Sequence, residues 1–593
     1  MTSFKILGHR LKRLLARNVA SICLLIAIFS PNVARADAPL LTELVGTDVG
    51  ICVEINGLKK QFDDLPNAEW FRRLIQLPFV KAWQQGPEYA KLQVGKVGLE
   101  ALVGLPLDRF AAELFGDSVL LVIVPTENGK PEAMLLSRAE RDDSWDRVLR
   151  LWDQLEAHDV QTMSAYGRSF QRRRKKVDGL KAGPDLFTTK VGRTLAISES
   201  ETQIRSVLAR ADSNTGANVP TNLANFTPYK SATAALPEGC SIRVVMNPRV
   251  WDTEFQKSPP QEAWISEVWK KLEWLSVGVE LHDGVVFHAV VHHETGGLPE
   301  AWQQVVQASQ AKSDLAARLP ANSLLAGEIQ LDPKLFDWIR TLDQSDRSRR
   351  DWQTFAKVAR GLLGRELFAE VLPHFHPNLG GAIVPSTALN EQSAPVDAVL
   401  AWEFSAPQNE TATAEQPTLR ESLDSGLSAL LNFSAMSHNG QNPESAAVIR
   451  RTLHEGSVIR WLEGLSPYRP AFGVLERHLL VATSPQLISA FQIQSAEKSL
   501  ATEPLFSTVR SRHFADQTQW LFVNAFVVRQ FVNDNREPLS RQLAYWRKIE
   551  VSKADKHLDR LTEMLSPFDV AFSAIKLSAG EVRWTSGFVT PTR

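Results

Sequence analysis

Three serines in the chain are each followed three positions later by a lysine, a spacing found in serine penicillin-recognising enzymes. The pairs are Ser309 with Lys312, Ser495 with Lys498, and Ser573 with Lys576. In those enzymes one helical turn holds the amine beside the hydroxyl, but Ser573 and Lys576 lie in a run that predicts a strand, where they would point to opposite faces. No Ser-Asp-Asn motif follows any pair. The spacing therefore favours no serine nucleophile.

Histidines gather within twelve residues, and a metal ion needs three or four such ligands that converge in space. The four are His282, His288, His292 and His293. The zinc-binding motif His-Glu-x-x-His is missing, because His293-Glu294 is followed by Thr-Gly-Gly. We therefore predict no metal site, and we expect these histidines to face water on edge strands.

The strongest charge run is Arg168–Lys176, in which six of nine residues are basic. Basic side chains cannot be buried without partners, so the run predicts a flexible, exposed loop. Such a loop could bind an anionic surface or a phosphate-rich polymer, although a solvated loop is the simpler interpretation. The candidate anion-binding residues are Arg168, Arg172, Arg173, Arg174, Lys175 and Lys176.

Other chemistries leave short signatures that this sequence lacks. It contains no P-loop, no dinucleotide-binding Gly-x-Gly-x-x-Gly and no Gly-x-Ser-x-Gly nucleophile elbow. We therefore predict no catalytic residues and no cofactor, and the chain leans away from an enzyme.

The N-terminus has the three parts of a secretory signal peptide. Five basic residues lie between Lys5 and Arg17, an uncharged apolar run follows at Val19–Phe29, and Ala34-Arg35-Ala36 supplies small residues for cleavage. Eleven apolar residues are too few to cross a bilayer comfortably. We expect residues 1–36 to be removed near Ala36, which places the mature chain in the periplasm or outside the cell, with no membrane span.

Cleavage changes the charge balance and the cysteine count. The mature chain keeps 60 Lys and Arg against 67 Asp and Glu, a net charge of −7, which argues against nucleic acid as a partner. Two cysteines remain, Cys52 and Cys240. An exported protein could join them, but two cysteines make no disulfide framework, and two buried thiols are the simpler interpretation.

The chain contains paired landmarks in matching order, about 260–285 residues apart. Two copies at so long a period predict two similar globular modules rather than a solenoid. We expect a first module at residues 40–294, a helical connector at 295–318 and a second module at 319–593. The paired landmarks are Gly50–Asn56 with Leu324–Gln330, Val119–Pro125 with Leu379–Pro385, and Gly192–Ile204 with Glu476–Ile488.

Within each module, helical patterns alternate with hairpins rather than with single parallel strands. For example, Leu275–Leu281 and Val285–Val291 flank His282-Asp283-Gly284, and Asp-Gly favours a tight hairpin turn. In the first module the apolar spacing of Trp70–Gln85 predicts a helix that Pro78 breaks or kinks. The pattern indicates an α+β fold: two similar modules, each a mainly antiparallel sheet with helices on one face.

This layout resembles an exported bacterial family catalogued as domain of unknown function 3352, which is frequent in planctomycetes. The resemblance is strongest at Gly50–Asn56, Phe115–Pro125 and Gly192–Ile204, and it covers most of residues 40–590. The second module departs from the pattern, because Gly380-Gly381 replaces two apolar strand residues. The family brings no catalytic residues, so the resemblance implies an exported protein and names no site.

Three functions are consistent with these observations. The leading hypothesis is a non-catalytic exported protein that binds a protein or another envelope component. A secreted hydrolase with an unfamiliar site would need a cleft with a buried carboxyl group of raised pKa. A carrier of an apolar ligand would need an apolar cavity of roughly a few hundred cubic ångströms, whereas a binding protein would show an exposed apolar patch.

Overall fold

The protein divides into two compact units, Met1–Gly297 and Leu298–Arg593, called unit 1 and unit 2 below. The boundary falls inside the connector expected at 295–318. The expected signal peptide, residues 1–36, lies outside the described residues. The structure, a computed structural model, describes residues 40–591 apart from the segments 58–63, 127–130, 156–157, 176–184, 213–220, 258–262, 295–299, 311–312, 334–345, 387–393, 408–416, 466–467 and 494–497.

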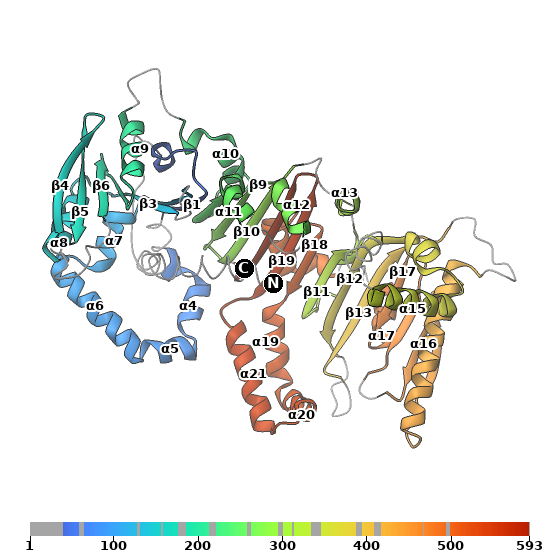
Figure 1. Ribbon diagram of the computed structural model, residues 1–593. Helices are drawn as coiled ribbons and strands as arrows, with labels where there is room; N and C mark the ends of the chain where they lie inside the picture. Colours follow the sequence, from blue (N-terminus) through green and yellow to red (C-terminus); the bar gives the residue numbers. More distant parts are fainter. Residues whose placement is uncertain are drawn as a thin grey trace. The chain divides into compact units, whose positions relative to one another are not determined.

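In unit 1, strands β1 to β10 form a sheet in which neighbouring strands are antiparallel (Figure 1). The order across the sheet is β4-β5-β6-β7-β3-β2-β1-β8-β9-β10, so β1 lies between β2 and β8. The strands are β1 Ile51–Asn56, β2 Ser118–Val124, β3 Glu132–Arg138, β4 His158–Ala165, β5 Arg168–Lys175, β6 Asp185–Val191, β7 Thr194–Ser198, β8 Ile242–Met246, β9 Leu272–Glu280 and β10 Gly284–His293.

The helices of unit 1 are mostly short and connect these strands. They are η2 Leu41–Leu44, η3 Leu65–Asn67, α4 Glu69–Ile75, α5 Pro78–Gln84, α6 Pro87–Val103, α7 Leu107–Phe115, α8 Ser144–Leu155, α9 Glu201–Asp212, η5 Leu223–Asn225, α10 Thr227–Ala234, η6 Pro248–Trp251, α11 Asp252–Lys257 and α12 Ala263–Lys271. The predicted break at Pro78 is confirmed, because Pro78 is the first residue of α5. Its missing N–H costs nothing there, since the first N–H groups of a helix have no intrahelical partner.

Helices pack on both faces of the unit 1 sheet near β7. Ala196 packs in a cluster with Ile204 of α9, on the face that we call the core face. Its neighbour Leu195 packs with Trp145 of α8. Adjacent residues of a strand point to opposite faces, so the expectation that helices lie on one face is wrong for this part of the sheet. The α+β class and the antiparallel sheet are confirmed.

In unit 2, strands β11 to β20 form a second antiparallel sheet with the order β14-β15-β16-β17-β13-β12-β11-β18-β19-β20. Adding ten to each strand number of unit 1 gives this order. The strands are β11 Leu325–Gln330, β12 Phe375–Pro385, β13 Val396–Phe404, β14 Val448–His454, β15 Ser457–Glu463, β16 Ala471–Val474, β17 His478–Ala482, β18 Gln519–Val523, β19 Val570–Ser578 and β20 Glu581–Val589.

The helices of unit 2 again pack on both faces of their sheet. Leu479 of β17 packs with Leu423 of α16. Gly473, which pairs with Leu480, lies against Ile488 of α17, and this second side is the core face of unit 2. The helices are α13 Glu300–Ala308, η7 Leu315–Ala317, α15 Asp346–Leu363, the π-helical turn η8 Leu367–Val371, η9 Leu372–His374, α16 Leu419–Gln441, α17 Pro485–Ile493, η11 Leu500–Thr502, α18 Pro504–His513, α19 Ala525–Asp534, α20 Arg536–Arg547 and α21 Val551–Leu565.

Two further features bear on function. Helices α19, α20 and α21 pack together beside β19 (Figure 1), and Arg536 holds α20 to α21 through Asp555 and Asp559.

In the part of the chain that the structure describes, no helix is long and apolar enough to span a bilayer.

Candidate binding surface

The unit 2 sheet leaves large apolar side chains exposed on the face opposite its core face. Each of these side chains is between 43% and 55% exposed. Strand pairing puts them on one side, because Val481 pairs with Leu400 and Leu400 with Gly381. The pairing continues from Gly381 to Gly327 and from Gly327 to Leu521. We call this set the apolar face: Ile329, Leu400, Val481, Leu521, Trp584 and Phe588.

Two glycines shape the middle of the apolar face. A Cβ on Gly381 would lie 2.9 Å from Leu400 Cδ2, and a Cβ on Gly327 would lie 3.3 Å from Leu521 Cδ1. Both leucine side chains therefore fold over a neighbouring glycine instead of standing upright. Gly381, one of the two glycines that weaken the sequence match of the second module, thus has a structural role, since it lets Leu400 lie low on the sheet.

The apolar face extends across several neighbouring strands of the sheet. It runs from β17 to β20, which are six strand spacings apart, or about 29 Å at about 4.8 Å per strand. The largest exposed apolar patch of a typical monomer covers roughly 300–600 Å², and such patches often mark interaction sites. An exposed apolar patch is the feature by which a binding protein would differ from a hydrolase or a carrier.

A hollow of about 490 Å³ lies at one end of the apolar face. Leu400 and Val481 line it and also belong to the apolar face, so the hollow opens onto that face. Its polar side chains are few: Thr483 Oγ1 donates to Asp397 Oδ1 at 2.9 Å, which leaves Tyr468 as the other polar lining residue. The complete lining is Ala398, Val399, Leu400, Leu465, Tyr468, Pro470, Val481, Ala482 and Thr483.

The opposite, core face of the same sheet holds a buried carboxyl group, Glu328. Its side chain accepts a hydrogen bond from Trp520 Nε1 at 3.3 Å. Burial raises the pKa of Glu328 to about 6, although hydrogen bonds from Ser313 and Trp520 and the charge of Arg510 lower it in part. Glu328 is 3% exposed, so this carboxyl group is closed off and does not line a cleft.

A histidine on the same core face is also shifted. Burial and, to a smaller extent, the charge of Arg318 lower the pKa of His478 to about 4. His478 pairs with Glu403, whose carboxylate binds Arg477. These buried groups make a structural polar layer, which gives a secreted hydrolase no accessible acid or base here.

The basic run expected as a flexible loop is a strand. Arg168–Lys175 is β5, which pairs with β4 along its length and with β6 in its second half. The expectation failed because acidic residues distant in sequence supply partners. Arg173 is 2% exposed and pairs with Asp153 of α8, and its Nε lies 3.4 Å from Thr188 Oγ1.

The neighbouring arginines share one carboxylate. Arg172 Nε and Arg174 Nε donate to Asp185 at 2.9 Å and 2.7 Å. These two guanidinium groups hold the pKa of Asp185 at about 2. Arg168 is exposed and donates to Ala211 O at 3.4 Å. Lys176 lies outside the described residues. Among the candidate anion-binding residues, Arg172, Arg173 and Arg174 thus pair with carboxylates within unit 1.

The histidines expected to face water divide between two environments. His282 is exposed and the ring of His292 stacks on Trp274 at 3.8 Å, but His288 and His293 are buried. The expectation is wrong for these two. For His288 the reason is register: it pairs with Gly278 and so points to the core face of unit 1.

The two mature cysteines and the serine–lysine pairs give clear outcomes. Cys52 and Cys240 are free, buried thiols, as the simpler interpretation held. Ser309 is buried and its hydroxyl donates to Val306 O and Leu577 O.

Ser573 Oγ accepts from Trp584 Nε1 at 2.9 Å, whereas Lys576 Nζ binds Asp516 at 2.6 Å. Both side chains come from β19, but each contacts a different partner, so they do not form a pair. Lys312 and Ser495 lie outside the described residues.

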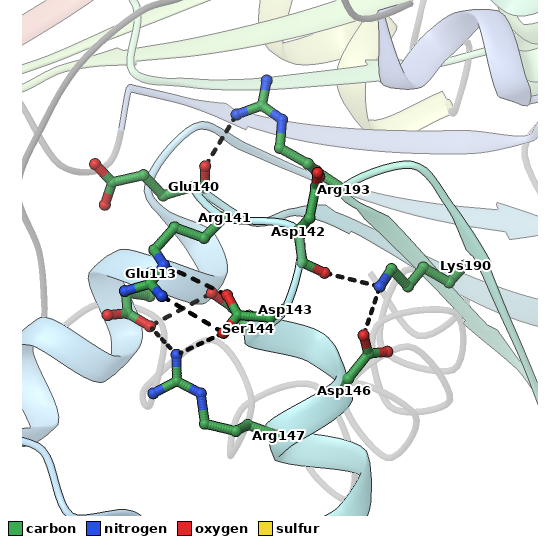
Figure 2. A network of polar contacts seen from close by, with 10 residues as sticks. All are labelled: Glu113, Glu140, Arg141, Asp142, Asp143, Ser144, Asp146, Arg147, Lys190 and Arg193. Carbon is green, nitrogen blue, oxygen red and sulfur yellow. Dashed lines mark hydrogen bonds and ion pairs between the residues drawn. The ribbon is translucent and has the colours of Figure 1, made fainter.

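A polar network fixes the start of α8 (Figure 2). Lys190 Nζ contacts Asp142 O and Asp146 Oδ2, both at 2.7 Å. Arg147 bridges Glu113 of α7 and Asp143, each at 3.5 Å. These ion pairs are partly solvated, and such pairs stabilise a fold only modestly. The network positions α8 against α7 and β6.

Comparisons with known proteins add little to this description. No protein-family model and no curated protein matches the sequence. Among solved structures, crystal form I of TP0453 matches with a TM-score of 0.23 at 7% identity, over 46% of this chain and 86% of that chain. Crystal form III matches with a TM-score of 0.24 at 8% identity, over 47% and 89%. Likenesses of this size carry no inference about function.

Proposed function

We propose that this chain is an exported, non-catalytic binding protein that holds a protein partner of the cell envelope on the apolar face of unit 2. The observation that carries the proposal is the row of exposed side chains from Val481 to Leu521, with the hollow at its end. A standard protein interface buries about 800 Å² on each partner. A patch about 29 Å long would supply the apolar centre of such an interface.

A protein partner fits this surface better than a small apolar ligand does. Ligand pockets bury about 70–90% of a small molecule. The hollow opens onto the apolar face through Leu400 and Val481, so it cannot enclose a ligand in that way. It can accept one anchoring side chain of a partner whose remaining surface covers the face, which is how the central residues of many interfaces bind.

The remaining parts of the proposal come from the sequence. The basic, apolar and small-residue segments before Asp37 support export with cleavage near Ala36. The net charge of −7 after cleavage supports a partner other than nucleic acid. The paired landmarks support an internal repeat, with which the shared strand order of the two units agrees, and the resemblance to domain of unknown function 3352 supports an exported protein.

Photo-crosslinking tests the proposed interface in the producing cell. A photoreactive phenylalanine analogue at Leu400 should give one discrete protein adduct, and Val481→Asp in the same chain should abolish it. The matched control is the same analogue at Phe433, an apolar side chain of α16 that is 72% exposed and outside the apolar face. Equal adducts from positions 400 and 433, or none from 400, would contradict the proposal. A lipid recovered from the purified protein and lost in Leu400→Asp would favour the carrier instead.

A further inference from the structure

Three potential metal ligands meet on the core face of unit 1. Cys240 precedes β8, Glu280 ends β9, and His288 lies in β10. The thiol sulfur, a carboxylate oxygen and a ring nitrogen all lie within 4.8 Å of one another. His288 Nε2 is 3.2 Å from Glu280 Oε1. These residues are up to 48 positions apart in the sequence, and the pairing of three strands brings them together.

Gly278 makes room for the thiol beside the histidine. It pairs with His288 on one side and with Arg243 on the other. A Cβ at position 278 would lie 2.5 Å from Cys240 Sγ, a distance that no real Cβ tolerates. The sulfur therefore occupies the space that a side chain on β9 would fill. This places the sulfur near the imidazole instead of beneath a larger residue.

We propose that Cys240, Glu280 and His288 form a zinc site with three protein ligands. Thiolate, imidazole and carboxylate are the ligand types that Zn²⁺ takes in proteins, and three protein ligands leave one of its four positions for water. The softer thiolate favours zinc over magnesium or calcium, which prefer oxygen ligands. The site lies in unit 1, and it does not depend on the binding surface proposed for unit 2.

The distances suit a tetrahedral ion after a small adjustment. Bonds of about 2.0–2.1 Å to nitrogen and oxygen and about 2.3 Å to sulfur put neighbouring ligand atoms roughly 3.3–3.6 Å apart. The 3.2 Å separation of His288 Nε2 from Glu280 Oε1 already matches this value. The longest separation in the cluster, at most 4.8 Å, must shorten by about 1 Å, which rotation of the partly buried Glu280 and of the Cys240 side chain can supply.

The charges also balance. A Cys240 thiolate and the Glu280 carboxylate together neutralise Zn²⁺, and His288 binds as the neutral imidazole. The nearby cation Arg243 would repel the metal ion, but its charge also favours the thiolate form of Cys240. Burial and the charge of Glu280 raise the pKa of Cys240 to about 12, so binding near pH 7 must release the thiol proton as the Zn–S bond forms.

The competing interpretation is a buried His288–Glu280 ion pair beside an inert thiol. Cys240 and His288 are 4% and 5% exposed, whereas the Glu280 side chain is 17% exposed and offers an entry route for a metal ion. The two interpretations differ in what they expect of Cys240. A metal site needs its sulfur as a ligand, and the ion pair does not.

Calorimetric titration of the mature chain with Zn²⁺, after removal of bound metal by a chelator, tests the site. We expect one zinc per chain and a heat that changes with the ionisation enthalpy of the buffer, because one proton leaves. Cys240→Ala and His288→Ala should each weaken binding by at least about 100-fold. Co²⁺ should give the intense near-ultraviolet band of a thiolate–cobalt bond in the wild type but not in Cys240→Ala.

Matched variants separate ligand loss from unfolding. Cys52→Ala removes the other buried thiol and His282→Ala an exposed histidine, and both should bind zinc as the wild type does. If Cys240→Ala does not fold, Glu280→Gln keeps the side-chain shape and should still weaken binding. A wild-type chain that takes up no zinc, or zinc binding that survives in all three ligand variants, would overturn the proposal.

Discussion

Glu54 of β1 and Glu328 of β11 occupy the same place in their two sheets. Glu54 pairs with Leu120 of β2, and Glu328 pairs with Gly380 of β12. The sequence repeat aligns Leu120 with Gly380, because Val119–Pro125 matches Leu379–Pro385. Across the next two strands, Leu120 leads through Leu136 to Ala196, and Gly380 leads through Ala401 to Leu480. The sequence comparison aligns Ala196 with Leu480, so all three paired landmarks agree with the strand pairing.

The two glutamates also have similar partners with different consequences. Glu54 accepts a hydrogen bond from Tyr229 Oη at 3.4 Å, and Glu328 accepts one from Trp520 Nε1 at 3.3 Å. On the next strand, Glu54 pairs with Arg243, whereas Glu328 pairs with the uncharged Trp520. The position is kept in both units, but the charge that could compensate the carboxylate is present in only one of these strand pairs.

The division into two compact units predicts that each unit folds alone. Residues 37–297 and 298–593, produced separately, should each unfold in one cooperative thermal transition, because each has a complete sheet and its own buried cluster. Circular dichroism on heating is the measurement. A half that is unstructured alone would show that the unit is not an autonomous domain.

Apolar patterns in the sequence were enough to predict strands β1 and β2 and the β9–β10 hairpin. Gly50–Asn56 contains β1 and Val119–Pro125 covers all of β2 but its first residue, and Asp283-Gly284 lies where the turn between β9 and β10 ends, as expected. Cys52 and Leu120 pack in one cluster and Ile55 and Val119 in another, so both strands are buried on both faces and form largely apolar runs. The α+β class followed from them.

Contacts between distant residues decided what the sequence could not show. The strand β5 can hold Arg172, Arg173 and Arg174 because Asp153 and Asp185 compensate their charges. The two aspartates are too far from the arginines in the sequence to form a recognisable local motif. The Cys240–His288 cluster depends on strand register and on the missing side chain of Gly278. The apolar face was equally hidden, since an exposed apolar strand and a covered one have the same pattern.

Gly381 should resist substitution because its space is occupied. In Gly381→Ala the new Cβ would lie 2.8 Å from Val399 O and 2.9 Å from Leu400 Cδ2, so we expect a loss of about 1–3 kcal/mol in the free energy of unfolding. Gly361→Ala, in exposed α15 with no atom within 4 Å, should instead stabilise the protein by about 0.5–1 kcal/mol. Urea unfolding compares the two. Equal effects would show that the sheet adjusts around Gly381.

Arg173 should matter for stability rather than for anion binding. Arg173→Ala leaves Asp153 without its buried partner and should lower the free energy of unfolding by about 3 kcal/mol. Arg168→Ala removes an exposed side chain and should change it by less than about 0.5 kcal/mol. Denaturant unfolding is the measurement. If β5 binds polyanions instead, heparin affinity should fall steeply with salt and Arg168→Ala should weaken it.

The mature protein should begin at Asp37. The residues before it have the order of a signal peptide, with small side chains at Ala34 and Ala36 for the peptidase. Mass spectrometry of the protein from its native source checks the N-terminus, and Ala36→Lys should block cleavage because the peptidase accepts only small residues there. A wild-type protein that retains Met1 and sediments with membranes would contradict export by this route.

Glu328 should make stability depend on pH in a predictable direction. Its pKa is about 6 in the folded state against an ordinary value of 4.5 for a glutamate, so the folded protein holds the proton more tightly than the unfolded chain does. Stability from this group is complete below about pH 4.5 and is lost as pH rises through 6. The loss is about 2 kcal/mol, since one pKa unit corresponds to about 1.4 kcal/mol.

His478 contributes an opposite dependence, because its folded pKa of about 4 lies below the ordinary histidine value of 6.5. Its stabilisation is present above pH 6.5 and is lost as pH falls towards 4.

The experiment compares the free energies of unfolding of the wild type and of Glu328→Gln. Both proteins keep His478, so its contribution cancels when one free energy is subtracted from the other. In Glu328→Gln the amide oxygen can still accept from Trp520 Nε1, so only the titrating group is lost. The free energy of unfolding of Glu328→Gln minus that of the wild type should therefore rise by about 2 kcal/mol between pH 4 and pH 7. Urea titrations at each pH measure it, and a difference that stays flat or falls would show that Glu328 ionises as readily in the folded protein as in the unfolded chain.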